Sequence, residues 1–177
     1  AELMMNGMVR PENIADFSGR IYKEANRLGN LVADIIQLSR LDEQQDAVVS
    51  MESVELDELA KDVVNNLRDH AEKKNISLDY CGIPINIQGV RHVLYEMLYN
   101  IADNAVRYTN PGGHIHIYVG RKGDRPFYRV EDDGIGIPKS EQKRIFERFY
   151  RVDKSHSRQT GGTGLGLSIV KHGATLH

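Results

Sequence analysis

Three short motifs in the second half of the chain combine residues that could do chemistry together. Residues 160–171 read TGGTGLGLSIVK, a glycine-rich loop that runs straight into an amphipathic helix. Glycine permits positive φ angles and close approach of the backbone. The first turn of a helix offers unpaired N–H groups and a positive dipole charge. This combination predicts a seat for an anion, of which phosphate is the usual one.

The second motif, at residues 96–108, reads EMLYNIADNAVRY. Asn100 and Asn104 stand four residues apart, so a helix would project both carboxamides from one face. Their oxygens suit Mg²⁺, a hard cation that takes few protein ligands together with waters and substrate phosphates. Arg107, a turn beyond Asn104, would give the same face a cation for a phosphate.

The third motif, at residues 132–138, reads DDGIGIP and follows the strand-like residues 127–130. Asp132 at a strand end could accept a hydrogen bond from an exocyclic amine such as that of adenine. Gly134 and Gly136 would let the backbone close over a flat ring. Each motif alone is more typical of a turn, a cap or a polar helix surface. All three in this order favour a nucleotide site.

A fourth segment, RIFERFYRVD at residues 144–153, lies between the last two motifs. In this order the segments resemble the N, G1, F and G2 boxes of sensor histidine kinases, within the larger family of gyrase, Hsp90 and MutL-type ATPases. The resemblance extends over essentially the whole chain and is nearest to membrane-anchored bacterial two-component kinases of the phosphate-regulon sensor type. It implies the Bergerat ATP-binding fold, ATP and Mg²⁺ as ligands, and transfer of the γ-phosphoryl group to a histidine.

The resemblance also implies roles for single residues. Asn104 and Asn100 would hold Mg²⁺. Arg107 would meet a phosphate, although many relatives carry a lysine there, and a guanidinium is not a neutral replacement. Asp132 would read adenine. The adenine pocket would also include Tyr108, packing on the nucleotide, together with Gly134, Gly136 and Ile137.

The glycine loop and the segment before it would form a lid over the phosphates. The residues that would approach the phosphates or anchor the lid helix are Gly162, Thr163, Gly164, Leu165, Gly166 and Leu167. Arg148 and Arg151 would stabilise the transferring group as catalytic charges. The alternative for both arginines is a solvated face of the lid.

Length and composition agree with a soluble domain. The chain has 177 residues, of which 40% are hydrophobic and 27% charged, and its formal net charge of −2 gives no reason to expect nucleic-acid or membrane-surface binding. One cysteine excludes an internal disulfide. No run of 18 apolar residues is present, so we expect this part of the protein to be cytoplasmic. The resemblance implies that it is the cytoplasmic portion of a sensor anchored in the inner or plasma membrane.

The first part of the chain, residues 1–43, predicts a partial helical hairpin for dimerisation. Two series at seven-residue spacing run along residues 11–43, and seven of their eight members are apolar, which is typical of a bundle seam. The two series are Ile14, Ile21, Leu28, Ile35 and Phe17, Glu24, Leu31, Leu38. We therefore expect a homodimer in which two hairpins form a four-helix bundle.

The remaining elements must position the motifs. Residues 44–50 are polar and predict a linker, and residues 51–177 alternate between strand and helix patterns. Strands are expected at 53–56, 76–81, 85–88, 114–119 and 127–130, and helices at 57–74 and 90–108. This order predicts a two-layer α/β sandwich, a mixed sheet with helices on one face.

Two departures from the family pattern bear on activity. None of the seven histidines lies in a phosphoacceptor-like box, so we expect no autophosphorylation by this chain alone. The family normally continues with two strands beyond the last glycine helix, so we expect a truncated ATP-binding domain. The response regulator receiver domain that the resemblance implies as a partner cannot be specified from these residues.

Two other functions stay open. A gyrase- or Hsp90-type ATPase would place a glutamate general base where Asn100 stands, and Glu96 lies a further turn away, which disfavours that route. A non-catalytic dimerisation module that only senses ATP is the other alternative.

Overall fold

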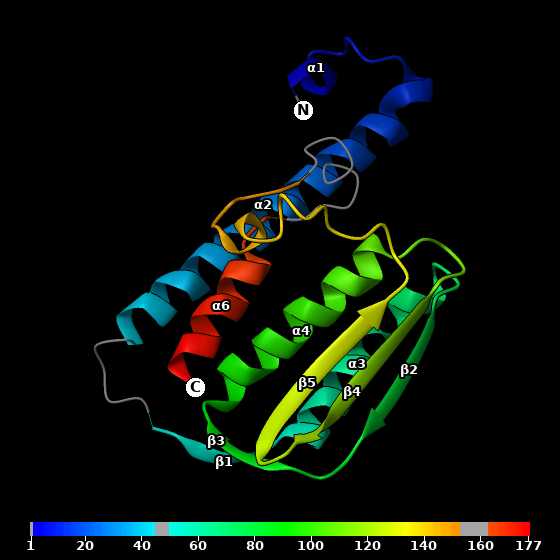
Figure 1. Cartoon of the computed structure of the whole chain (residues 1–177). Coiled ribbons are helices and arrows are strands. Elements are labelled where there is room, and N and C mark those ends of the chain that lie inside the picture. Colours follow the sequence, from blue (N-terminus) through cyan, green and yellow to red (C-terminus); the bar gives the residue numbers. More distant parts are fainter. Residues whose placement is uncertain (1, 45–49, 153–162) are drawn as a thin grey trace.

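A long helix leads into an α/β sandwich in the computed structural model, which describes residues 2–44, 50–152 and 163–177 (Figure 1). The helix, α2 (Ile14–Gln44), follows the short helix α1 (Glu2–Met5) and the 3₁₀ turn η1 (Pro11–Asn13). Pro11 suits the first position of a helical turn because its missing N–H would be unpaired there in any case. The prediction of a helix over residues 11–43 therefore agrees closely with the structure.

The sandwich contains a mixed three-stranded sheet of order β2-β4-β5 and a separate antiparallel pair, β1-β3. Strand β2 runs parallel to β4, and β5 runs antiparallel to β4. The elements are β1 (Glu52–Glu55), α3 (Leu56–Glu72), β2 (Ser77–Gly82), β3 (Asn86–Gly89), α4 (Arg91–Tyr108), β4 (His114–Lys122), β5 (Arg125–Asp132), η2 (Arg144–Phe146) and α6 (Gly166–Leu176). The predicted fold class, a mixed sheet with helices on one face, is confirmed.

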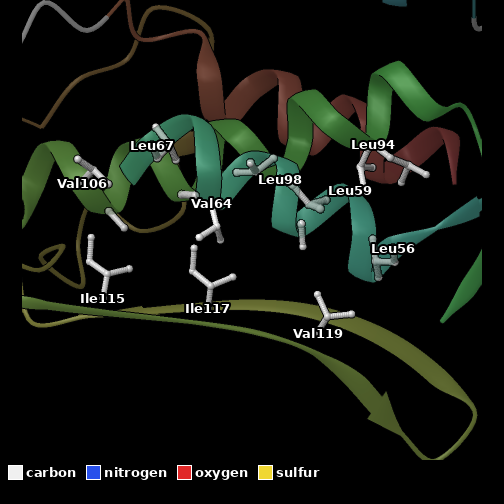
Figure 2. Packing of buried hydrophobic residues seen from close by; sticks show 14 of the residues in the cluster. Leu56, Leu59, Val64, Leu67, Leu94, Leu98, Val106, Ile115, Ile117 and Val119 are labelled. Carbon is white, nitrogen blue, oxygen red and sulfur yellow. The ribbon is translucent and has the colours of Figure 1, made fainter. Parts of the chain in front are cut away.

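The core lies between the three-stranded sheet and helices α3 and α4. Strand β4 alternates, with Ile115 and Ile117 fully buried and His114 and His116 exposed. Figure 2 shows Ile115, Ile117 and Val119 of β4 pointing at the helices, and Leu67 and Leu98 of these helices belong to the same buried cluster. Period-two alternation on β4 and an apolar stripe on α3 thus fix the two layers face to face.

A second, smaller cluster joins the last helix to the rest of the molecule. Val90, Val93, Leu165 and Ile169 are buried together, and Leu31 of α2 packs against them. Figure 1 shows α6 between α2 and α4, and α6 contacts both helices. The glycine motif is therefore held by packing on the asparagine helix.

The hairpin of β4 and β5 is longer than predicted. The two strands pair out to Lys122 and Arg125, and Gly123 turns between them with φ +62°. The added residues are mostly charged, so the apolar alternation that predicts a strand stops before them. The backbone pairing nevertheless continues through them. Within the described ranges, each helix is too short or too polar to traverse a bilayer.

Candidate nucleotide-binding site

Asn100 meets the first residue of the glycine helix α6. Its Nδ2 donates to the carbonyl oxygen of Glu96 at 2.9 Å, which fixes the carboxamide along α4. A Cβ built on Gly166 would lie only 2.6 Å from Asn100 Oδ1, so a side chain at position 166 would displace the Asn100 carboxamide. Two motifs that are far apart in the sequence therefore touch.

The arrangement fits a cation of the Mg²⁺ type. Because Nδ2 of Asn100 is used within α4, its oxygen is the atom presented toward the start of α6. Asn104 lies a turn further along α4 and is half-buried. Among the described residues, no group of three or more His, Cys, Asp or Glu side chains could hold a metal. An amide oxygen presented at a helix N-terminus is a ligand that Mg²⁺ accepts, because Mg²⁺ keeps waters and takes substrate phosphates as its other ligands. The part of Asn104 in such a site stays a prediction.

The loop after β5 lies against the C-terminal end of α4. Ile135 N donates to the carbonyl oxygen of Tyr108 at 3.2 Å, and Gly134 N donates to Asp132 Oδ1 at 3.0 Å. A Cβ on Gly134 would come within 2.6 Å of Tyr108 O. Gly136 has φ +68°, and Ile137 is exposed. The structure thus places Gly134 and Ile135 beside Tyr108. The adenine roles of Asp132, Gly134, Gly136 and Ile137 stay a prediction.

Asp133, the neighbour of Asp132, is fixed by His114. Its Oδ1 accepts from His114 N at 2.8 Å, and its Oδ2 lies 3.0 Å from His114 Nδ1. The backbone amide first, and the imidazole second, hold the pKa of Asp133 below its ordinary value. The sequence motif singled out Asp132 and predicted no partner for Asp133. In the structure one is tied to β4, and the other, Asp132, caps the loop at the end of β5.

Arg107 is ion-paired within its own helix. Its Nε donates to Asp103 Oδ2 at 2.5 Å, one turn back along α4. Both side chains are mostly buried. The predicted contact of Arg107 with a phosphate stays a prediction, and it would have to share or exchange this carboxylate.

The glycine loop is anchored to the segment that precedes it. Phe149 N donates to Gly164 O at 2.9 Å, and both residues have positive φ angles, +62° and +78°. Thr163 Oγ1 accepts from Leu165 N at 3.3 Å. Leu165 is fully buried in the second cluster, and Leu167 is half-buried, in agreement with their anchoring role. Gly162 lies outside the described residues.

The two candidate catalytic arginines differ. Nε and Nη2 of Arg151 are buried and have no hydrogen-bond partner among the described residues, whereas Arg148 is exposed. Buried, unpaired guanidinium nitrogens are costly unless an acceptor arrives. Nearby, Arg144 lies over the ring of Tyr150, whose hydroxyl donates to Glu141. This contact of Arg144, Tyr150 and Glu141 was not predicted from the sequence, because the three residues are scattered through a polar stretch.

The sandwich, the asparagine helix and the glycine-led helix define a nucleotide-binding domain of the ATPase type. Residues 89–177 match the family described as histidine kinase-, DNA gyrase B- and HSP90-like ATPase. This match spans α4, the β4–β5 hairpin and α6. The chain belongs to that family.

Known relatives are similar along most of the chain. The sensor-like histidine kinase SenX3 of Mycolicibacterium smegmatis is 34% identical over 178 residues, which is all of this chain and 46% of SenX3. The chain thus spans about half the length of this relative. The structure of the mycobacterial sensor histidine kinase MprB is 28% identical with a TM-score of 0.62, over 72% of this chain and 80% of MprB. Full-length ShkA in complex with AMPPNP is 26% identical with a TM-score of 0.72, over 92% of this chain and 34% of ShkA.

Proposed function

We propose that this chain is the ATP-binding catalytic portion of a sensor histidine kinase, which transfers the γ-phosphoryl group of ATP to a histidine for relay to a response regulator aspartate. The observation that carries the proposal is the contact of Asn100 with Gly166. It sets a ligand suited to Mg²⁺ beside the N-terminus of α6, where backbone N–H groups have no acceptor within the helix.

Each side of the site has a defined task. Asp132, with the loop through Gly134, Gly136 and Ile137, receives adenine, and Tyr108 packs on the nucleotide. Thr163, Gly164, Gly166 and the turn that follows supply backbone donors to the phosphates. Mg²⁺, held by Asn104 and Asn100, would neutralise charge on the phosphates. Phosphoryl transfer depends chiefly on such positioning and charge neutralisation.

Arg151 is the better supported of the two catalytic arginines. Its buried Nε and Nη2 lack acceptors among the described residues, and it follows the segment that bonds to Gly164. A phosphoryl oxygen would satisfy these donors and gain a bidentate charge-assisted contact. Arg148 is proposed as the second charge because it lies on the same segment.

The partners follow from helix α2 and from the family. Ile14, Ile21, Leu28 and Ile35 are all exposed on α2, and a second copy of the chain would bury them in a bundle. The proposal places this chain in the cytoplasmic portion of an inner- or plasma-membrane sensor, with a receiver domain as the phosphoryl acceptor downstream.

Hydrolysis of the gyrase or Hsp90 type is disfavoured by the position of Glu96. This glutamate lines an open groove between α3 and α4, together with Asp62, Arg91 and Tyr95. That groove lies toward the N-terminal half of α4, whereas the site uses the half that runs from Asn100 to Tyr108. A carboxylate there is poorly placed to activate water at the phosphates.

Nucleotide affinity tests the adenine side of the site. We expect D132N to weaken ADP and ATP binding by about 10- to 100-fold, because a hydrogen bond to a charged group contributes about 1.5–3 kcal/mol. Isothermal titration calorimetry measures the loss. D124N, in the exposed turn between β4 and β5, is the matched control. Equal affinity of D132N and D124N would overturn the adenine assignment.

The metal side is tested by titrating Mg²⁺. N104A should lose the metal-dependent part of ATP binding and keep most of the metal-free part, because it removes the carboxamide proposed to bind Mg²⁺ and leaves the adenine loop unchanged. If N104A and the parent chain give the same Mg²⁺ dependence, Asn104 has a structural role only.

Phosphoryl transfer itself is tested with radiolabelled ATP. The chain alone should stay unlabelled, and a separately supplied bundle domain with an acceptor histidine should gain an acid-labile, alkali-stable label. Label on this chain alone would show that one of its own histidines accepts. No label on the supplied domain, with ATP bound, would favour the sensing module.

A further inference from the structure

The C-terminal end of α4 is closed by a side chain from outside the predicted motifs. The last four carbonyl groups of an α-helix have no N–H donor within the helix. In α4 these belong to residues 105–108. Ala105 O accepts from Thr109 N at 2.9 Å, and Tyr108 O accepts from Ile135 N. The remaining two carbonyls need donors from elsewhere.

Lys74 provides them. Its Nζ donates to Val106 O at 2.7 Å and to Arg107 O at 3.0 Å. It also donates to Thr109 O, just past the helix, at 2.8 Å. All three N–H bonds of the ammonium are therefore used, and every terminal carbonyl of α4 is satisfied. Lysines at a helix C-terminus are also favoured by the helix dipole.

The surroundings of Lys74 make this contact strong. Lys74 is half-buried in the turn after α3, and its own carbonyl accepts from Gly112 N at 3.2 Å. Burial lowers the pKa of Lys74 from its ordinary value. A desolvated ammonium that donates to three carbonyls gains more than a solvated one, because little water competes.

The same turn of α4 carries part of the proposed nucleotide site. Arg107 and Tyr108 belong to it, and Tyr108 O holds the adenine loop through Ile135 N. Without Lys74, two carbonyls of this turn would be left without their donor, and the turn could open to reach water. The loop through Asp132 would then lose its anchor.

We propose that Lys74 is a positioning residue for nucleotide binding: it holds the last turn of α4 and, through Tyr108 O, the backbone of the adenine loop. The expected effect of Lys74 on nucleotide affinity rests on the proposed function. Its structural part, the link from Lys74 to the Ile135 amide, does not depend on any ligand.

Two readouts on K74M test it, with K73M as the matched control because Lys73 is the exposed neighbour. Without nucleotide, amide hydrogen exchange should speed up at least about tenfold at Ile135 and stay unchanged at Ile117 in the core strand. With nucleotide, the Kd of ADP should rise about tenfold. K74R should restore most of both, because a guanidinium can still donate to several carbonyls.

The outcomes separate the two proposals. Unchanged exchange at Ile135 and unchanged ADP affinity in K74M would overturn the role of Lys74 while the proposed function stands. A parent chain that binds no ADP would defeat the proposed function, and the exchange result would still decide on Lys74. If K74M does not fold by circular dichroism, K74Q replaces it. K74Q should then show faster exchange at Ile135 and a higher Kd for ADP than K74R, and equal values would overturn the proposal.

Discussion

Helices α2 and α3 are both amphipathic, yet their apolar residues have different surroundings. On α3, Leu59, Val63 and Leu67 are buried against the sheet and α4. On α2, Ile21 and Leu28 are 39% and 48% exposed, and Leu31 is the seam residue packed on the sandwich cluster. Regular apolar spacing thus accompanies a helix in both segments, but only the apolar face of α3 is buried within the described part of the chain.

The difference shows what helical spacing encodes. A stripe of apolar residues favours a helix wherever some surface can cover it, and burial of one large apolar side chain contributes about 1.5–3 kcal/mol. For α3 that surface is in the same chain. For α2 we proposed that it belongs to a second copy. Substitutions on α3 should therefore lower the free energy of unfolding, whereas substitutions on α2 should weaken self-association.

The largest effect is expected from L67A on α3. Leu67 is fully buried, and its truncation should lower the free energy of unfolding by about 2–5 kcal/mol through lost burial and a cavity. Urea unfolding followed by circular dichroism measures this. L28A on α2 is the matched control and should change the monomer by less than about 0.5 kcal/mol. Equal losses in both variants would mean that α2 is as well covered as α3.

The next effect concerns the start of α3. Asp57 is buried, and it accepts from Lys61 Nζ and from the Tyr80 hydroxyl, both at 2.6 Å. The Lys61 contact first, and the Tyr80 contact second, hold the pKa of Asp57 below its ordinary value. D57N should cost about 1–3 kcal/mol of stability at neutral pH, because a charged, buried hydrogen-bond network is broken.

The pH dependence of D57N follows from the direction of that shift. The native state binds fewer protons here than the unfolded chain, whose aspartate titrates near pH ~3.9. The contribution of Asp57 is therefore full above that pH and is lost as the pH falls through the lowered native pKa. Urea midpoints at pH 7, 5, 4 and 3 should converge for D57N and the parent as the pH drops. A constant gap between them would refute this assignment, and D62N is the exposed control.

The smallest effect on stability is expected from I21E on α2. Because Ile21 is partly exposed in the single chain, unfolding of the monomer should change by less than about 0.5 kcal/mol. Self-association, measured by sedimentation equilibrium, should weaken at least about tenfold, or about 1.4 kcal/mol, because a charge enters the seam. An unchanged association constant would exclude this seam as the dimer interface.

Local patterns were enough to predict most elements of the fold. Helices α3 and α4 and the first part of β4 were located from their apolar periods, which depend on near neighbours in the sequence. The pairing of β1 with β3 outside the main sheet was not predicted. Strand partners are chosen by the packing of the whole domain, and a four-residue strand carries too little pattern to indicate its partner.

In the candidate site, too, local motifs could be predicted and contacts between distant residues could not. Asn100, Asp132 and Gly166 could be proposed as site residues because their motifs are local, and the structure brings Asn100 to Gly166 and the Asp132 loop to Tyr108. Lys74 was missed because a lysine after an amphipathic helix looks like any solvated charge. The Asp103 partner of Arg107 was also missed, although its four-residue spacing was a usable signal.

The contact between Asn100 and Gly166 also sets the order in which the protein gains its function during synthesis. Asn100 emerges from the ribosome before α6, together with the helix that carries it. The proposed phosphate seat exists only once α6, far later in the chain, has docked on that helix. A nascent chain that stops before Gly166 can form the α3–α4–β4 core but has no complete seat. Nucleotide binding therefore reports that α6 has been made and has folded into place.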